Sequence, residues 1–168
     1  QSRTGSWNGS NLHDHVFGCC NGGPGAAVDT SGGGTIWFAW GRSTVSQSIA
    51  INTALSGTGL TVGGLNYSYD YYNYGYNRGT LTTNINVTNS SNQNIYNYSF
   101  SNPQTGQNAW VNQAGTLNFD NPYALQNLGN ASISFTGKDD RFWAGYYGPA
   151  VKDVSLSLNY TLALPKVE

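Results

Sequence analysis

Near the carboxyl end of the chain lies the stretch Val154-Ser155-Leu156-Ser157-Leu158-Asn159-Tyr160-Thr161-Leu162, in which apolar and polar side chains alternate without a break. Successive side chains of a β-strand point to opposite faces of the sheet, so this stretch predicts a strand with one packed face and one solvated face. An amphipathic helix would need apolar residues three and four positions apart. The stretch therefore favours a protein built from sheets.

The same period of two recurs upstream. It predicts further strands in the segments 35–41, 45–51, 65–76, 81–87, 95–100, 116–119 and 131–136. Turn signals separate them, among them Ser56-Gly57-Thr58-Gly59, Gly63-Gly64 and Asn89-Ser90-Ser91-Asn92. Only 121–128 has the character of a helical turn. Many strands without a long helix predict an all-β antiparallel sandwich.

Length and composition restrict the class of protein. A chain of 168 residues and 18.0 kDa suits one domain. Only 9% of the residues are charged and the net charge is -1, which excludes the basic footprint of a nucleic-acid-binding protein. No apolar run is long enough for membrane insertion. The chain opens at Gln1 and has no Met, so we expect an exported, processed product, extracellular or on a virion surface.

The chain divides into three parts by its pattern. Residues 1–34 are rich in Gly and Ser and show no periodicity, so we expect an extended arm or loop outside the sandwich. The alternating part, 35–164, predicts the sandwich itself. Residues 165–168 remain as a short tail.

Two segments carry a family resemblance. The first is Ser43-Thr44-Val45-Ser46-Gln47-Ser48-Ile49, and the second runs from Asp140-Arg141-Phe142-Trp143-Ala144-Gly145-Tyr146-Tyr147-Gly148 to the closing Asp153-Val154-Ser155. Both resemble the galactose-binding-like jelly-roll family, which includes carbohydrate-binding modules and the sugar-binding F-box-associated region. The resemblance spans about 35–160 and implies a jelly-roll β-sandwich. The chain also resembles extracellular and virion structural proteins of aquatic bacteria and their phages.

The resemblance also bears on cofactors. In several members of that family an acidic side chain of the closing strand helps to bind a structural calcium ion, and Asp153 occupies that position. Calcium takes six to eight oxygen ligands, which Asp153 and backbone carbonyls of the arm would share. The alternative is an ordinary aspartate at the end of a turn. We expect no other cofactor.

The tyrosines of 65–76 suggest a binding surface. Tyr67, Tyr69 and Tyr71 share one face of the predicted strand, and their rings offer flat apolar area with hydroxyl tips for a sugar. We expect Trp143 and Tyr146 of the resembling segment to join them. The alternative is that this face of the strand belongs to the core.

The predicted arm contains His13-Asp14-His15 followed by Cys19 and Cys20. His and Cys side chains are zinc and copper ligands, but this spacing matches no standard metal site. Adjacent cysteines cannot staple distant parts of one chain. We therefore expect a vicinal disulfide, two free thiols or cross-links between subunits.

Seven sequons make the chain a candidate glycoprotein. They lie at Asn8, Asn66, Asn86, Asn89, Asn97, Asn130 and Asn159. Several of these asparagines alternate with apolar residues and should face solvent, whether or not they carry glycans.

The sequence offers little for catalysis. Its only Glu is Glu168, and the sole carboxylate pair, Asp139-Asp140, lies on a predicted turn. We therefore expect a non-catalytic extracellular structural protein, a self-assembling subunit of a filament, virion or cell-surface layer. Its partners would be copies of itself and, in the alternative hypothesis, glycans bound by a lectin-like module. A glycoside hydrolase ranks third.

Overall fold

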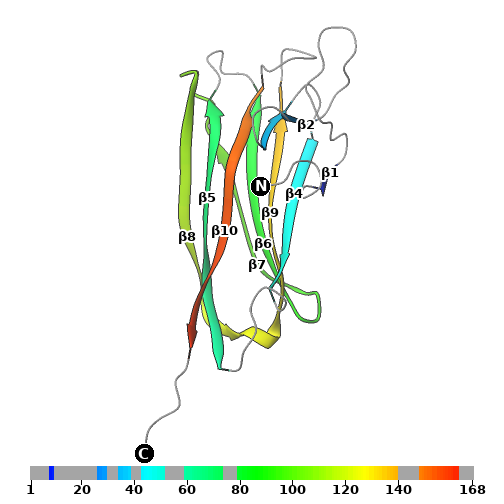
Figure 1. Ribbon diagram of the computed structural model, residues 1–168, viewed down its shortest axis with the longest axis vertical. Coiled ribbons are helices and arrows are strands. Elements are labelled where there is room, and N and C mark those ends of the chain that lie inside the picture. Colours follow the sequence, from blue (N-terminus) through cyan, green and yellow to red (C-terminus); the bar gives the residue numbers. More distant parts are fainter. Residues whose placement is uncertain are drawn as a thin grey trace, which may run out of the picture.

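The computed structural model describes residues 8–9, 26–29, 34–38, 43–51, 59–73, 79–139 and 148–162. Within these ranges the chain forms β-strands almost throughout, and they run along the long axis of the molecule (Figure 1). Their bounds are β1 (Asn8–Gly9), β2 (Ala26–Asp29), β3 (Thr35–Phe38), β4 (Ser43–Ala50), β5 (Leu60–Asn73), β6 (Thr80–Asn89), β7 (Asn94–Asn102), β8 (Ala109–Ala124), β9 (Leu128–Lys138) and β10 (Ala150–Leu162).

The strands form two antiparallel sheets. Sheet A has the order β1-β4-β9-β6-β7, and sheet B has the order β2-β3-β10-β5-β8. The eight strands β3 to β10 thus alternate between the sheets as 3-10-5-8 and 4-9-6-7, which is the strand order of a jelly roll. The expected all-β jelly-roll sandwich is confirmed, and the order of the strands alone establishes it.

Two local predictions about strand limits need correction. The pair Gly63-Gly64 is not a turn: it lies inside β5, where the pairing with β8 shifts between Val62 and Gly64. A Cβ atom on Gly64 would collide with the backbone carbonyl of Leu117, so glycine is required by close strand approach. The strand expected at 116–119 is the much longer β8. The expected helical turn exists as a short 3-10 helix, Leu125–Asn127, between β8 and β9.

The amino-terminal segment is partly built into the sandwich. β1 pairs with β4, and β2 pairs with β3, so each extends one sheet at its edge. The prediction that 1–34 lies wholly outside the sheets is therefore wrong for these two strands. The backbone groups of a neighbouring sheet edge supply partners to a Gly-rich chain that has no periodicity of its own. His13, His15, Cys19 and Cys20 lie outside the described residues, as do Trp143 and Tyr146.

The core fills the space between the two sheets. Apolar residues at alternate positions of every long strand point inward, and the largest fully buried side chains include Tyr69, Phe38 and Phe135. In β10 the predicted alternation is observed for Val154, Leu156 and Leu158, which pack against the core. It is wrong for Tyr160 and Leu162, which follow a shift in the pairing with β5 and are 55% and 53% exposed. None of the helical structure among the described residues has the length and apolar character needed to cross a membrane.

Candidate functional site

The tyrosines that we expected to bind sugar lie in the core. The exposed fractions of Tyr67, Tyr69 and Tyr71 are 7%, 0% and 5%. Their side of β5 also carries Leu65 and faces sheet A, where the ring of Tyr69 meets the ring of Phe135 edge to face at 4.9 Å. The prediction of a sugar-binding Tyr67/Tyr69/Tyr71 face is wrong because burial of these apolar rings against the second sheet stabilises the fold.

The hydroxyl of Tyr69 explains why a tyrosine is tolerated there. It donates to the side-chain oxygen of Asn102 and lies 2.7 Å from the hydroxyl oxygen of Thr83. The Asn102 amide in turn donates to Thr83 at 2.8 Å and to the carbonyl of Leu81 at 3.2 Å. Burial raises the pKa of Tyr69 far above its usual value, more than these hydrogen bonds lower it. This buried network joins sheet B to sheet A.

The opposite face of sheet B carries the exposed aromatic residues. Trp37 of β3, Tyr72 of β5 and Trp110 of β8 lie in one row across the sheet, because Trp37 and Tyr72 both pair with Ala150 of β10 and Tyr72 pairs with Trp110. The three rings touch one another. Their centroids are 5.7 Å apart for Trp37 and Tyr72, 5.3 Å for Tyr72 and Trp110, and 6.1 Å for Trp37 and Trp110.

The residue between the rings makes this cluster compact. Ala150 is fully buried although it belongs to the outward side of β10, in register with Trp37 and Tyr72. Its methyl group leaves the space above β10 to the two larger rings. All three rings remain partly exposed. The row is thus a fixed aromatic surface rather than a set of independent side chains.

A polar row lies next to the aromatic row. Lys152, Asp70 and Asn112 are in register across β10, β5 and β8. The ammonium nitrogen of Lys152 lies 4.3 Å from the centroid of the Trp110 ring, a cation–π geometry. The Asn112 amide donates to Asp70 Oδ1 at 2.9 Å. We call Trp37, Tyr72, Trp110, Asp70, Asn112 and Lys152 the sheet B patch.

Small polar side chains continue along the same face. Asn66 and Asn159 exchange amide hydrogen bonds, at 2.6 Å from Asn66 to Asn159 and 3.2 Å in the reverse direction. The hydroxyl of Thr116 donates to Asn66 at 2.7 Å. Beside the sheet B patch, the surface therefore consists of short, uncharged side chains that are fixed by hydrogen bonds to one another.

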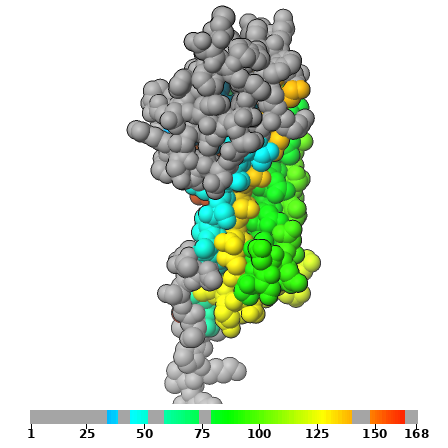
Figure 2. Space-filling view, turned by 90° about the vertical axis from the view of Figure 1, so that its right-hand side faces the viewer, coloured from blue at the N-terminus to red at the C-terminus, as the bar shows by residue number. Residues whose placement is uncertain are grey.

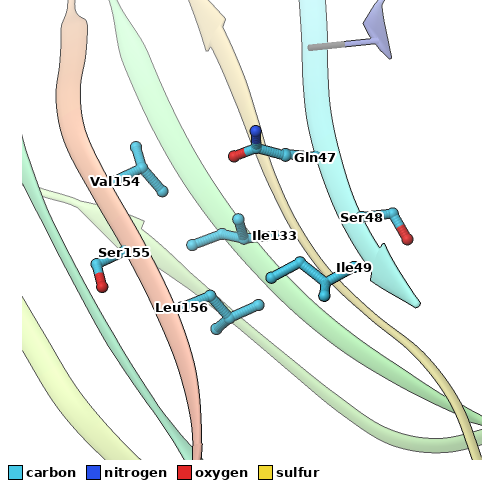
Figure 3. Close-up of a pocket in the computed structure, with 7 residues that line it drawn as sticks. All are labelled: Gln47, Ser48, Ile49, Ile133, Val154, Ser155 and Leu156. Atoms are coloured by element: carbon cyan, nitrogen blue, oxygen red, sulfur yellow. The ribbon is translucent and has the colours of Figure 1, made fainter. Parts of the chain in front are cut away.

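A separate groove opens at the side of the sandwich, between β4 and β10 (Figure 3). Its volume is about 330 Å³. Gln47 and Ile49 of β4 point toward β10, and Val154 and Leu156 of β10 point toward β4, whereas Ser48 points away. The lining residues are Gln47, Ser48, Ile49, Ile133, Val154, Ser155 and Leu156. The groove has neither a ring to stack on a sugar nor a charged group, so it is a weaker candidate than the sheet B patch.

Asp153, the expected calcium ligand, is exposed at an irregularity in the pairing of β10. Its backbone φ is 53°, a left-handed conformation that aspartate adopts more readily than most residues. The left-handed backbone conformation thus explains why an aspartate is found at this position. In the described part of the chain no three His, Cys, Asp or Glu residues gather as metal ligands. Calcium binding at Asp153 stays a prediction.

The expected glycosylation sites are distributed over both outer faces. Asn86 and Asn97 are paired across sheet A, and the side chain of Asn89 accepts backbone hydrogen bonds from Ser91 and Gln93 in the turn between β6 and β7. Asn130 is exposed. Asn8 lies in β1, and Asn66 and Asn159 form the amide pair on sheet B. Whether any of them carries a glycan stays a prediction.

Of the Asp139-Asp140 pair, the structure describes only Asp139. Asp139 is buried at the end of β9, and Asp140 lies outside the described residues.

None of the residues of the sheet B patch is predicted as a site residue from the sequence. The sequence does contain a signal for Tyr72. Tyr72 lies on the same face of β5 as the polar residues Asn66, Ser68 and Asp70. An aromatic residue on an otherwise polar strand face is more informative than one on an apolar face.

Comparison with known proteins gives likeness in structure alone. No protein-family model and no curated protein matches the chain. The CBM22-1 xylan-binding domain of Xyn10C from Paenibacillus barcinonensis is 12% identical, with 94% of this chain and 88% of that chain covered and a TM-score of 0.46. An arabinose-bound MgGH51 α-L-arabinofuranosidase is 11% identical, with 91% and 23% covered and a TM-score of 0.43.

A viral protein is among the structural neighbours as well. The Gx strain of infectious bursal disease virus gives 10% identity, 93% and 32% coverage and a TM-score of 0.44. The chain spans less than a third of the arabinofuranosidase and about a third of the viral chain. A carbohydrate-binding module and a viral chain thus both occur among the neighbours. At these scores no functional conclusion follows from them.

Proposed function

We propose that this protein is a non-catalytic, extracellular glycan-binding protein and that the sheet B patch is its binding surface. The observation that carries the proposal is the row of three touching, partly exposed rings, Trp37, Tyr72 and Trp110, on a solvent-facing sheet. The residue types on this face match what sugars require: flat apolar area beside fixed hydrogen-bonding groups.

The rings provide the apolar contact. The face of a pyranose presents C–H groups, which are attracted to the electron-rich face of an aromatic ring while water leaves both surfaces. Tyr and Trp lose little side-chain entropy on binding, and these three rings are already held by one another. Stacking a sugar on this row therefore orders little of the protein.

The polar row provides direction. The carboxylate of Asp70 accepts hydrogen bonds from hydroxyl groups, and the ammonium of Lys152 donates them. The Asn112 amide holds Asp70 in place at 2.9 Å. One positive and one negative side chain leave the patch without net charge, which favours a neutral glycan over a sulfated or uronic one.

We propose binding without hydrolysis because the sheet B patch has too few carboxylates for a glycoside hydrolase. A glycoside hydrolase needs two carboxyl groups on either side of the scissile bond. Among the described residues of the sheet B patch, Asp70 is the only carboxylate. A second function, assembly with copies of itself, is favoured by one long strand edge and is taken up below.

The test is a binding survey with the full chain. A glycan array, followed by calorimetry on neutral polysaccharides such as xylan, mixed-linkage glucan, mannan and galactan, should yield at least one ligand. Binding should change tryptophan fluorescence, and no reducing ends should accumulate on long incubation. Absence of binding to the whole panel at millimolar sugar would contradict the proposal, and so would release of reducing ends.

A further inference from the structure

Strand β8 forms one edge of sheet B and is the outermost strand on the left in Figure 1. Its inner side pairs with β5 over ten consecutive residues, from Asn73↔Ala109 to Gly64↔Asn118. Among the described residues no strand pairs with its outer side. The alternate N–H and C=O groups of that side therefore form a straight, regular edge.

This edge lacks the features that normally prevent strand addition. Native sheets protect their edges with charged side chains, proline, bulges or short strands. Residues 109–119 contain no charge and no proline, and the first such residues are Asp120 and Pro122 near the far end of β8. Strand β7, the corresponding edge of sheet A, is also uncharged, and its Tyr98 is 39% exposed.

We propose that β8 pairs antiparallel with β8 of a second copy about a two-fold axis, so that the two B sheets become one continuous sheet. Antiparallel pairing of identical strands is self-complementary, as a two-fold contact requires. It satisfies the outer backbone groups of both strands at once. A two-fold axis near Ala114 keeps the two Asp120 carboxylates at opposite ends of the interface, so no like charges meet.

The arrangement has a consequence for binding. The two-fold axis is perpendicular to the joined sheet, so the outer faces of both copies lie on the same side. Trp110 belongs to β8 itself, and each copy brings its own sheet B patch to this common surface. A dimer would thus offer two patches to one polymer and gain avidity without a new contact. The dimer itself does not depend on glycan binding.

The experiment is sedimentation of the full chain over a wide concentration range. We expect a reversible change from 18.0 kDa to twice that mass. Ala114→Lys puts a charge on the exposed middle of β8, where the two copies meet, and should raise the dimer dissociation constant at least tenfold. Ser157→Lys is the matched control: it adds the same charge to the same face, on β10, and should leave dimerisation unchanged.

Hydrogen exchange keeps the test valid if Ala114→Lys fails to fold. In the unaltered chain, amides of 110–118 that do not pair with β5 should become more protected as protein concentration rises. A monomer at all concentrations would overturn the proposal, as would a dimer that Ala114→Lys leaves intact. Protection of these amides that is independent of concentration would mean that the chain covers its own edge, and would overturn it too.

Discussion

The two outer faces of this sandwich are built from the same strand period but carry different chemistry. The face of sheet A, seen in Figure 2 as the neighbouring bands of β4, β9 and β6, consists of short hydroxyl and amide side chains in aligned rows. Across β4, β9, β6 and β7 the rows are Thr44-Thr136-Thr82-Ser101, Ser46-Ser134-Asn84-Ser99 and Ser48-Ser132-Asn86-Asn97. The face of sheet B has comparable polar rows but adds the sheet B patch, with its three aromatic rings and its two charged side chains, Asp70 and Lys152.

The difference shows why polarity alone does not make a sugar site. Hydroxyl and amide groups on sheet A already bond to one another, as Thr44 does with Thr136 at 2.8 Å and Asn84 with Asn97 at 2.7 Å. Exchanging such bonds, or bonds to water, for bonds to a sugar yields little net free energy. The rings of sheet B contribute apolar area whose removal from water is favourable. Binding should therefore be confined to sheet B.

The largest expected effect is that of Trp110→Ala. Removing the ring that touches Tyr72 and lies under Lys152 should weaken glycan binding by about 2 kcal/mol or more, roughly thirtyfold, as for a central aromatic residue of an interface. Calorimetry with the best ligand of the survey measures it. The matched variant on the other face, Asn84→Ala, should bind as the original chain does. An equal loss of glycan affinity in both variants would contradict the proposed difference between the faces of sheet A and sheet B.

The next effect separates the two sides of β5. Tyr69→Phe removes the hydroxyl that donates to the side-chain oxygen of Asn102 and contacts Thr83, and should lower the free energy of unfolding by about 1–3 kcal/mol, with glycan affinity unchanged. Urea denaturation measures the first quantity and calorimetry the second. Tyr71→Phe is the control, since the Tyr71 hydroxyl makes no hydrogen bond among the described residues, and it should change stability by under about 0.5 kcal/mol. A loss of affinity in Tyr69→Phe would put the binding surface on the wrong side of β5.

Stability should also depend on alkaline pH through the inward tyrosines. Burial raises the pKa of Tyr69, Tyr71 and Tyr96 in the folded chain. The folded state thus holds these protons more tightly than the unfolded state, whose tyrosines titrate near pH 10. Their contribution is fully present below about pH 10 and declines as pH rises further, by at most about 1.4 kcal/mol per pH unit for each tyrosine. Urea midpoints from pH 8 to 11.5 measure it, and Tyr69→Phe should show a shallower decline.

The smallest expected effect is that of Asp70→Asn. The amide keeps the size of the side chain but loses the charge that accepts hydrogen bonds, so glycan affinity should fall by about 1 kcal/mol, roughly fivefold. The matched variant is Asp120→Asn, which lies on the same face of β8 but outside the sheet B patch and should bind normally. Calorimetry at one ionic strength compares the two. An unchanged affinity in Asp70→Asn would remove the polar row from the site.

The sequence predicts the fold well because its information is local and repeated. The alternation in β6 and in β10 as far as Leu158 defines which residues face inward, and the strands of a two-sheet sandwich follow from it. The long β8 is different. Its first half has Gln113 and Gly115 where large apolar residues would mark a packed face, so only pairing with β5 reveals the strand.

The site is harder to predict than the fold because it depends on register. Trp37, Tyr72 and Trp110 are far apart in the sequence, and only the pairing of β3, β10, β5 and β8 brings them into one row. The expected shared face of Tyr67, Tyr69 and Tyr71 is real but is the packed one, as Leu65 of the same parity indicates. Parity along a strand thus predicts which face is exposed, whereas the neighbours across the sheet come from the tertiary structure.

The most direct test of the account is a chemical-shift titration of the isotope-labelled chain with its best glycan ligand. We predict that the largest shifts fall on the indole N–H signals of Trp37 and Trp110 and on the backbone amides of Asp70, Tyr72, Asn112 and Lys152, while those of β4, β6 and β9 stay in place. Shifts concentrated on the Ser, Thr and Asn rows of sheet A, with the sheet B patch unchanged, would contradict it.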